Sequence, residues 1–341
     1  MPRVIGIDAG TVSLDLVGLD NGRVFLERSF PVADVLADAS ILFAVLEGAA
    51  PLDLVVAPSG YGLPVTAARD LTDDDLALAF LAAPGEPGGI GGLKALLRAL
   101  ASLPVDVVVT PGVVHLPTVP PYRKANRVDM GTSDKVCAAA LAVHEQCARL
   151  GCGPEDASFI LLELGGAFTA ALAVEQGRIV DGLGGSSGPI GARASGALDG
   201  EVAFLAGHVS KEMIFIGGAD AIGGEDGWTA YRESALKAIA ALSVSAPLAR
   251  DVILSGRHAW RLGPENGVGG HLKRTVLTLG DSVTAKQGAY GAALVADGLA
   301  GGAATSIVDR LAIREASGTV LDHLHVIAPA VARATLGIGT R

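Results

Sequence analysis

Two stretches of the chain, residues 4–24 and 159–179, align without a gap and constrain the fold more than any other feature. The first reads VIGIDAGTVSLDLVGLDNGRV and the second reads FILLELGGAFTAALAVEQGRI. In this alignment Asp8 matches Glu163, and Gly10 matches Gly165. Each copy predicts a strand, a glycine turn with an acidic residue two positions before it, a second strand, a tight turn and a third strand. The repeat therefore predicts two similar half-molecules.

The tight turns of the two copies are equivalent as well. Asp20-Asn21-Gly22 and Glu175-Gln176-Gly177 both suit hairpin turns, because Asn and Gly tolerate positive φ. A chance likeness between two β-hairpins is the alternative explanation. The shared acidic residue favours a duplication, since a hairpin needs a turn glycine but does not need a carboxylate at the end of a buried strand.

The rest of the chain alternates between helical and strand patterns, and its 341 residues suffice for about two domains. Helices are predicted over 35–47, 73–82, 93–103, 134–150, 231–243 and 284–299, and strands over 54–57, 105–110 and 251–254. Residues 271–276 are read as a helix or turn, 306–312 as a strand and 319–326 as a helix. Gly288 and Gly291 indicate close packing of the alanine-rich helix that contains them. We predict an α/β fold.

Composition excludes several functional classes. The net charge of −10 disfavours nucleic-acid binding, because an acidic surface repels a phosphate backbone. No uninterrupted apolar run reaches the roughly 20 residues of a membrane-spanning helix. The N-terminus enters a strand at once, without the pattern of a signal peptide. Three cysteines, Cys137, Cys147 and Cys152, are too few for a disulfide framework. We expect a cytoplasmic protein without a membrane or nucleic-acid partner, and leave a homodimer open.

The two glycine turns are typical of phosphate binding. Turns rich in Gly, Thr and Ser present backbone N–H groups and hydroxyls to phosphate oxygens. The neighbouring carboxylates would repel phosphate directly but can hold Mg²⁺, which then binds phosphate. Asp8 and Glu163 are therefore the predicted metal ligands. Either turn alone is equally well explained as an ordinary hairpin, whereas the pair favours a clamp on one metal-bound polyphosphate.

Four segments together resemble the actin-like ATPase and sugar-kinase superfamily. They are IDAGT at 7–11, LLELGG at 161–166, VILSGR at 252–257 and AKQGAYGAA at 285–293, and their order in the chain carries the resemblance. Within the superfamily the sequence is most similar to the acetate and butyrate kinases, including a family of predicted butyrate kinases. The stretch Met130-Gly131-Thr132-Ser133-Asp134 stands where acetate kinases carry HGTSH.

The resemblance implies two ribonuclease-H-like domains around a nucleotide cleft, with ATP and Mg²⁺ as cofactors. It implies an N-terminal domain over 1–150 with the first phosphate loop and a C-terminal domain over 151–305 with the second phosphate loop and the adenosine loop. Residues 306–341 form a C-terminal segment that the pattern assigns to neither. The implied nucleotide-binding residues are Gly10, Thr11, Ser13, Gly165, Gly166, Thr169, Gly217, Gly218, Ser255, Gly256 and Arg257.

The sequence departs from acetate kinases on the acceptor side. Met130 replaces the family's catalytic histidine, Asp15 replaces the lysine of the first loop, and Pro111 stands where an aspartate is expected. The charged stretch at 122–135 offers substitutes. The predicted catalytic residues are Arg123 and Arg127, for gripping an acceptor carboxylate or neutralising charge on the transferring phosphoryl group, Asp129 and Asp134, for orienting an acceptor hydroxyl or helping to hold Mg²⁺, and His115. A solvated loop with a helix cap, and a packed structural histidine, are the alternatives.

These observations predict an ATP- and Mg²⁺-dependent kinase that makes an acyl phosphate from a short-chain carboxylate, in the manner of a butyrate kinase. A kinase of the same fold that acts on another small acceptor is the first alternative. The second is an ATPase switch whose domain closure regulates a partner protein.

Overall fold

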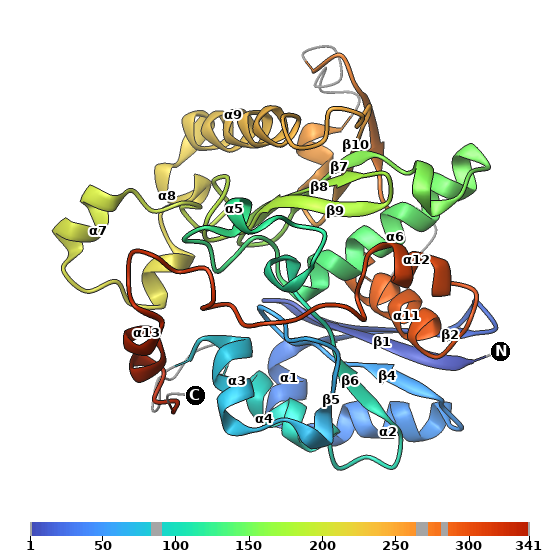
Figure 1. Ribbon diagram of the computed structural model, residues 1–341. Helices are drawn as coiled ribbons and strands as arrows, with labels where there is room; N and C mark the ends of the chain where they lie inside the picture. Colours follow the sequence, from blue (N-terminus) through green and yellow to red (C-terminus); the bar gives the residue numbers. More distant parts are fainter. Residues whose placement is uncertain (1, 83–90, 264–271, 281–285, 340–341) are drawn as a thin grey trace.

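The computed structural model describes residues 2–82, 91–263, 272–280 and 286–339 (Figure 1). It contains two mixed sheets. The strands of the first sheet are β1 (Arg3–Ala9), β2 (Ser13–Asp20), β3 (Arg23–Pro31), β4 (Leu54–Val56), β5 (Thr66–Ala67) and β6 (Val107–Val109). Those of the second are β7 (Phe159–Leu164), β8 (Thr169–Glu175), β9 (Arg178–Leu183), β10 (Asp251–Ser255) and β11 (Thr275–Thr278).

The two sheets share one topology. The first has the order β3-β2-β1-β4-β6-β5, and the second has the order β11-β10-β7-β8-β9. In each, three consecutive antiparallel strands form one side, and two later strands add parallel to the first of them. Only β5, which pairs antiparallel with β6, has no counterpart among the described strands of the second sheet. The predicted α/β fold with two similar halves is confirmed.

The likeness of the halves extends to single residues. The β2–β3 register shifts between Gly18 and Leu19, and the β8–β9 register shifts between Ala173 and Val174, which are matched positions of the repeat. The Gly10 amide donates to the Ser13 carbonyl at 2.9 Å. The matched pair, Gly165 and Phe168, repeats this bond at the same distance. A chance pair of hairpins would share neither the bulge nor the turn bond, so the structure supports duplication.

Helices cover both sheets and fill the space between them. Their bounds are α1 (Val32–Ala37), α2 (Ser40–Ala49), α3 (Asp73–Phe80), α4 (Gly91–Leu100), α5 (Pro121–Lys124), α6 (Ser133–Leu150), α7 (Gly200–Ala206), α8 (Ala219–Ile222), α9 (Gly224–Leu242), α11 (Gln287–Leu299), α12 (Thr305–Arg310) and α13 (Pro329–Thr335). Figure 1 shows α1–α4 outside the first sheet, α9 outside the second, and α6 with α11 between the sheets. None of the described helices has the length and apolar character that crossing a membrane requires.

Glycines allow the central helices to approach their neighbours closely. A Cβ on Gly291 of α11 would lie 1.9 Å from the Cys137 carbonyl oxygen of α6. A Cβ on Gly6 of β1 would lie 2.1 Å from the Ala293 amide nitrogen of α11. The prediction that the alanine-rich helix packs tightly is therefore confirmed. The same packing sets α6 and α11 side by side, with both helices starting at the cleft between the sheets.

We expect Gly291→Ala to lower the free energy of unfolding by about 3 kcal/mol, because the added methyl group would overlap the α6 backbone. Chemical denaturation measures this change. Gly48→Ala in α2 is the matched control, since no atom lies within 4 Å of a Cβ built there. Its better helix propensity should raise stability by about 0.5–1 kcal/mol. Equal effects of the two substitutions would contradict the close packing.

The described part of the C-terminal segment, residues 306–339, packs back over the central and first-half cores. Ile307, Val308 and Leu311 are buried with α6 and α11, and Val320 and Leu321 are buried with the residues under α1–α4. Residues 306–312, predicted as a strand, include most of α12, because their apolar side chains follow helical spacing. Residues 319–326 form turns instead of the predicted helix. There the Thr319 amide and hydroxyl both donate to the Asp322 carboxylate and close a single turn.

Two other predicted elements also differ. The predicted helix over 35–47 is split into α1 and α2, because Asp38 leaves helical geometry and its carboxylate accepts the Ser40 amide. Residues 275–276, predicted within a helix or turn, belong to strand β11, which pairs parallel with β10. Residue 271 of that prediction lies outside the described residues, as do 284 and 285 of the predicted helix over 284–299. The domain ranges 1–150 and 151–305 stay a prediction, and α11 within the second range packs on the first sheet.

Candidate active site

A cleft of about 1360 Å³ separates the two halves, and both glycine hairpins line it. The hairpins face each other closely. A Cβ on Gly166, at the tip of the second turn, would lie 3.8 Å from the Thr11 hydroxyl oxygen at the tip of the first. The first residues of α6 and α11 line the same cleft. Two turns, two helix starts and the ends of two central strands therefore meet at one place.

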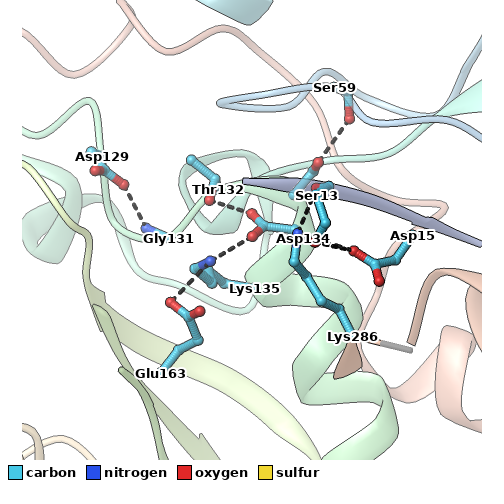
Figure 2. A network of polar contacts seen from close by, with 11 residues as sticks. Ser13, Asp15, Ser59, Asp129, Gly131, Thr132, Asp134, Lys135, Glu163 and Lys286 are labelled. Carbon is cyan, nitrogen blue, oxygen red and sulfur yellow. Dashed lines mark hydrogen bonds and ion pairs between the residues drawn. The ribbon is translucent and has the colours of Figure 1, made fainter. Parts of the chain in front are cut away.

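The start of α6 links the two halves electrostatically (Figure 2). The Lys135 ammonium lies 3.0 Å from the Glu163 carboxylate at the end of β7, and it also pairs with its neighbour Asp134. The Thr132 hydroxyl donates to Asp134 from the other side. Burial lowers the tendency of Lys135 to stay charged, but these carboxylates outweigh burial and raise its pKa. Lys135 is therefore a fixed cation between the hairpins.

Asp8 ends β1 as a buried carboxylate close to the start of α11. Its side chain lies against Gly288, where a Cβ would come within 2.6 Å of Oδ2. Burial and then the charge of Asp134 raise the pKa of Asp8 to about 6. Burial also raises the pKa of Glu163, although Lys135 opposes the rise. Both predicted metal ligands are thus carboxylates whose negative charge the surrounding protein does not fully compensate.

A lysine from the far end of the chain completes the first hairpin. The Lys286 ammonium donates to the Ser13 carbonyl at 2.7 Å and lies 3.2 Å from the Asp15 carboxylate. Asp15 is buried on β2 and also accepts the Ser13 hydroxyl at 2.7 Å. A Cβ on Gly10 would lie 2.4 Å from the same ammonium, so Lys286 reaches into the turn itself. The first hairpin turn contains no lysine of its own, and Lys286 from a distant part of the chain supplies an ammonium group there.

Asp129 and the serines hold the segment that leads into α6. The Asp129 carboxylate accepts the Gly131 amide at 3.1 Å and both the amide and hydroxyl of Ser186 at 3.0 Å. On the other side, the Ser59 hydroxyl hydrogen-bonds the Ser133 hydroxyl at 2.9 Å. These bonds fix residues 129–135 between the loop after β9 and the loop after β4. The position of Lys135 therefore depends on contacts from both halves.

The structure brings most of the predicted site residues to this cleft. Those that line it are Asp8, Gly10, Thr11, Ser13, Asp129, Asp134, Glu163, Gly165, Gly166, Ser255, Gly256 and Arg257. Thr169 lies behind the wall, fully buried on β8. Gly217 and Gly218 lie beyond its rim, where Gly218 packs on the backbone of Arg193. Those three are absent from the cleft's described lining.

Three predicted catalytic residues, His115, Arg123 and Arg127, also lie away from the cleft lining among the described residues. The Arg123 guanidinium donates to the Val180 carbonyl at 2.7 Å, and Arg127 lies 3.5 Å from the Ser187 carbonyl. His115 is 2% exposed, and burial lowers its pKa to about 4, so its ring is neutral at pH 7. In this structure the two arginines tie their loop to the second half, and the His115 ring packs against the Gly112 carbonyl within the first half.

Sequence reasoning missed Lys135 and Lys286. Lys135 stands in the same charged stretch as Arg123 and Arg127. Its position in the first turn of the predicted helix is the sequence signal that could have placed it at the cleft. With the helix starting at Ser133, Lys135 falls in the first turn beside Asp134. Lys286 stands in the AKQGAYGAA segment that was noted only for its order in the chain. The described residues contain no group of three or more His, Cys, Asp and Glu side chains placed to hold a metal ion.

A family model described as "Protein of unknown function (DUF1464)" matches residues 6–326. That range contains every residue that lines the cleft and both sheets except the first three residues of β1. The chain belongs to the DUF1464 family. No curated protein matches it in sequence.

Solved structures show which fold this DUF1464 chain shares. Acetate kinase from Entamoeba histolytica is 12% identical over 80% of this chain and 86% of its own, with a TM-score of 0.56. Acetate kinase from Porphyromonas gingivalis is 15% identical over 87% and 99%, with a TM-score of 0.55. A propionate kinase from Francisella tularensis is 12% identical over 85% and 99%, with a TM-score of 0.56. The chain therefore has the two-domain actin-like ATPase fold, as predicted.

Proposed function

We propose that this DUF1464 protein transfers the terminal phosphoryl group of ATP, with Mg²⁺, to a short-chain carboxylate. One observation carries the proposal: two matched glycine turns, each preceded by an acidic residue at the end of a central strand, face each other across one cleft. Such an arrangement suits a polyphosphate held from both sides, with backbone amides near its oxygens. Neither turn alone would support a kinase, since each is also a good hairpin.

The residues present fit a magnesium ion. Asp8 is buried, the Glu163 side chain is 17% exposed, and both carboxyl groups have raised pKa values, so a cation between them would offset their charge. Mg²⁺ is usually held by one or two carboxylates together with substrate phosphates, so two protein ligands suffice. When bound, the ion offsets the charge on the phosphate oxygens. Asp134 is near enough to Asp8 to raise its pKa and is a further candidate at this site.

The chain's own cations take the role first assigned to the arginines. Lys135 and Lys286 are held at the cleft by carboxylates on opposite halves. Both would neutralise negative charge that the phosphoryl group carries during transfer. Ser255, Gly256 and Arg257 follow β10 and line the cleft, where they would contact the nucleoside.

A carboxylate acceptor needs no general base, which fits a site without a histidine at its described lining. A carboxylate oxygen forms a bond to the terminal phosphorus, and the bond from that phosphorus to the bridging oxygen of ADP breaks. The products are an acyl phosphate and ADP, and no proton has to be removed from the acceptor. A hydroxyl acceptor would require a base, for which the cleft-lining carboxylate of Asp134 is a candidate.

The test is an ATPase assay against a panel of carboxylic acids, with hydroxylamine present to trap acyl phosphate. We expect hydroxamate to form with at least one acid, in an amount equal to the ADP released. ADP release stimulated only by a hydroxyl acceptor would replace this proposal with a kinase of another specificity. Slow ATP turnover that no metabolite stimulates would replace it with an ATPase switch.

A further inference from the structure

One part of the cleft is walled by large apolar side chains that phosphate chemistry does not use. Phe168 follows the tip of the second hairpin and packs edge-to-face on Phe215, with ring centroids 4.9 Å apart. Phe215 ends a short 3-10 helix, Glu212–Phe215, and the preceding residue, Ile214, also lines the cleft. The wall therefore comes from two separate segments of the second half.

Further contacts join this wall to Tyr61 of the first half. The backbone of Gly185 lies flat on Phe168, since a Cβ there would come within 2.6 Å of it. The side chain of the next residue, Ser186, lies beside the phenol of Tyr61 in the first half. The Lys211 ammonium lies 5.6 Å from the centroid of the Tyr61 ring, and residue 211 leads into the 3-10 helix that ends at Phe215.

We call this part of the cleft the acceptor chamber and define it by the cleft-lining residues Tyr61, Phe168, Gly185, Ser186, Lys211, Ile214 and Phe215. It adjoins the charged part of the site. Ser186 binds Asp129 through its amide and its hydroxyl, and Asp129 begins the segment that ends in Asp134 and Lys135. A ligand in the chamber could therefore place a carboxylate toward these charges and its remaining atoms against the aromatic wall.

The volume of the cleft supports two ligands. Sites for a single small molecule commonly measure about 300–1,000 Å³. The 1360 Å³ cleft is larger, which leaves room beside a nucleotide for an acceptor of appreciable size. A methyl group such as that of acetate would leave most of the aromatic wall without a partner, whereas a ring or a branched chain would bury it.

We infer that the acceptor is a monocarboxylate with an apolar body of several carbons, either a longer or branched chain or a ring, and that the acceptor chamber binds this body. The inference rests on the proposed function for the reaction itself. The aromatic wall is the observation that supports the choice of acceptor. Each methylene buried against such a wall improves binding about fourfold. Hexanoate should therefore exceed acetate in kcat/KM by about 10²-fold, and phenylacetate should exceed it by at least as much.

The experiment compares acetate, butyrate, isovalerate, hexanoate and phenylacetate in the hydroxamate assay, and measures binding of each acid by calorimetry. Phe215→Ala should lower kcat/KM for hexanoate and phenylacetate by about 10-fold or more and lower the value for acetate by a clearly smaller factor. The loss should appear mainly in KM. Phe215→Leu keeps an apolar wall, so its kcat/KM for the larger acids should lie between those of the parent protein and Phe215→Ala. Phe204→Ala on α7 is the matched control, because that ring is 78% exposed and lies outside the cleft's lining.

The two measurements separate the inference from the proposed function. Binding of the larger acids that Phe215→Ala weakens, without hydroxamate from any acid, would refute the kinase reaction and support the chamber. Equal use of acetate and hexanoate would overturn the inference while leaving the kinase standing. The inference would also fall if Phe215→Ala lowered kcat/KM equally for every acid, or if none of the larger acids bound.

Discussion

Asp8→Asn is expected to make the protein more stable and nearly inactive at once. We expect turnover with ATP to fall on the order of 10³-fold, because the substitution removes a charged ligand from the proposed metal site. In the absence of Mg²⁺ and nucleotide, we expect the free energy of unfolding at pH 8 to rise by roughly 2–3 kcal/mol. The neutral amide keeps the shape of the carboxylate and removes a buried charge that repels Asp134.

The raised pKa of Asp8 determines how the free energy of unfolding changes with pH. The pKa of Asp8 is about 6 in the folded protein, against 3.8 for an unperturbed aspartate. The folded state therefore binds more protons than the unfolded state between these values, and ionised Asp8 destabilises the fold progressively as the pH rises through about 6. The gain from Asp8→Asn should be full at pH 8 and absent near pH 4.

Denaturation at both pH values and a steady-state ATP assay measure the two effects. Asp70→Asn is the control, because Asp70 is exposed and its replacement should change stability by less than about 0.5 kcal/mol. Glu163→Gln tests the matched position and should reduce turnover comparably. A structural role for Asp8 predicts that stability and activity fall together. That result, or normal nucleotide affinity and turnover in both variants, would remove the metal assignment.

The sequence alone was sufficient for the duplicated core because the signals there are local. Each copy of the repeat encodes its own hairpin, and matched features such as Asn21 and Gln176, with φ of 53° and 50°, follow from turn chemistry. The acidic residue before each glycine turn then pointed to one shared cleft. The C-terminal segment gave no such signal. Its short apolar groups fit a strand or a helix equally well until the core they pack on is known.

The candidate site was predictable only where its residues follow a strand or open a turn. Asp8 and Glu163 end central strands, so their place at the cleft follows from the fold. The direction of a loop side chain does not. Arg123 and Arg127 lie close in sequence to Lys135, yet they turn toward backbone carbonyls of the second half, whereas Lys135 turns toward Glu163. Sequence distance of this kind also concealed Lys286, whose partner Ser13 is 273 residues away.

Exchanging Asp15 and Lys286 is expected to preserve a function that either single change destroys. We expect Lys286→Met and Asp15→Lys each to lower kcat/KM for ATP by about 10²-fold or more. The first removes the cation at the hairpin and leaves the carboxylate of Asp15, which is 3% exposed, without its ionic partner. The second places two ammonium groups within the same turn. The double variant Asp15→Lys/Lys286→Asp should recover to within about 10-fold of the parent.

The physical reason is that a phosphate site needs a fixed cation at the turn. Which part of the chain carries that cation matters less. In this chain the carboxylate of the ion pair stands on β2 and the ammonium precedes α11, so exchanging the two residues keeps both charges at the turn. The coupling measured between the two sites by unfolding should be about 2 kcal/mol. The exposed pair Glu233 and Lys237 on α9 is the control, with a coupling below about 1 kcal/mol.

Folded single variants that keep full activity would show that Lys286 serves only to hold α11 on the hairpin. A folded double variant as inactive as the single ones would show that the exact position of the ammonium matters, so that a lysine on β2 cannot replace one at the start of α11. Recovery in the double variant requires that a lysine at position 15 restores the positive charge and that its ammonium group reaches the hairpin turn. It would establish that the first phosphate loop of this protein is assembled from two ends of the chain.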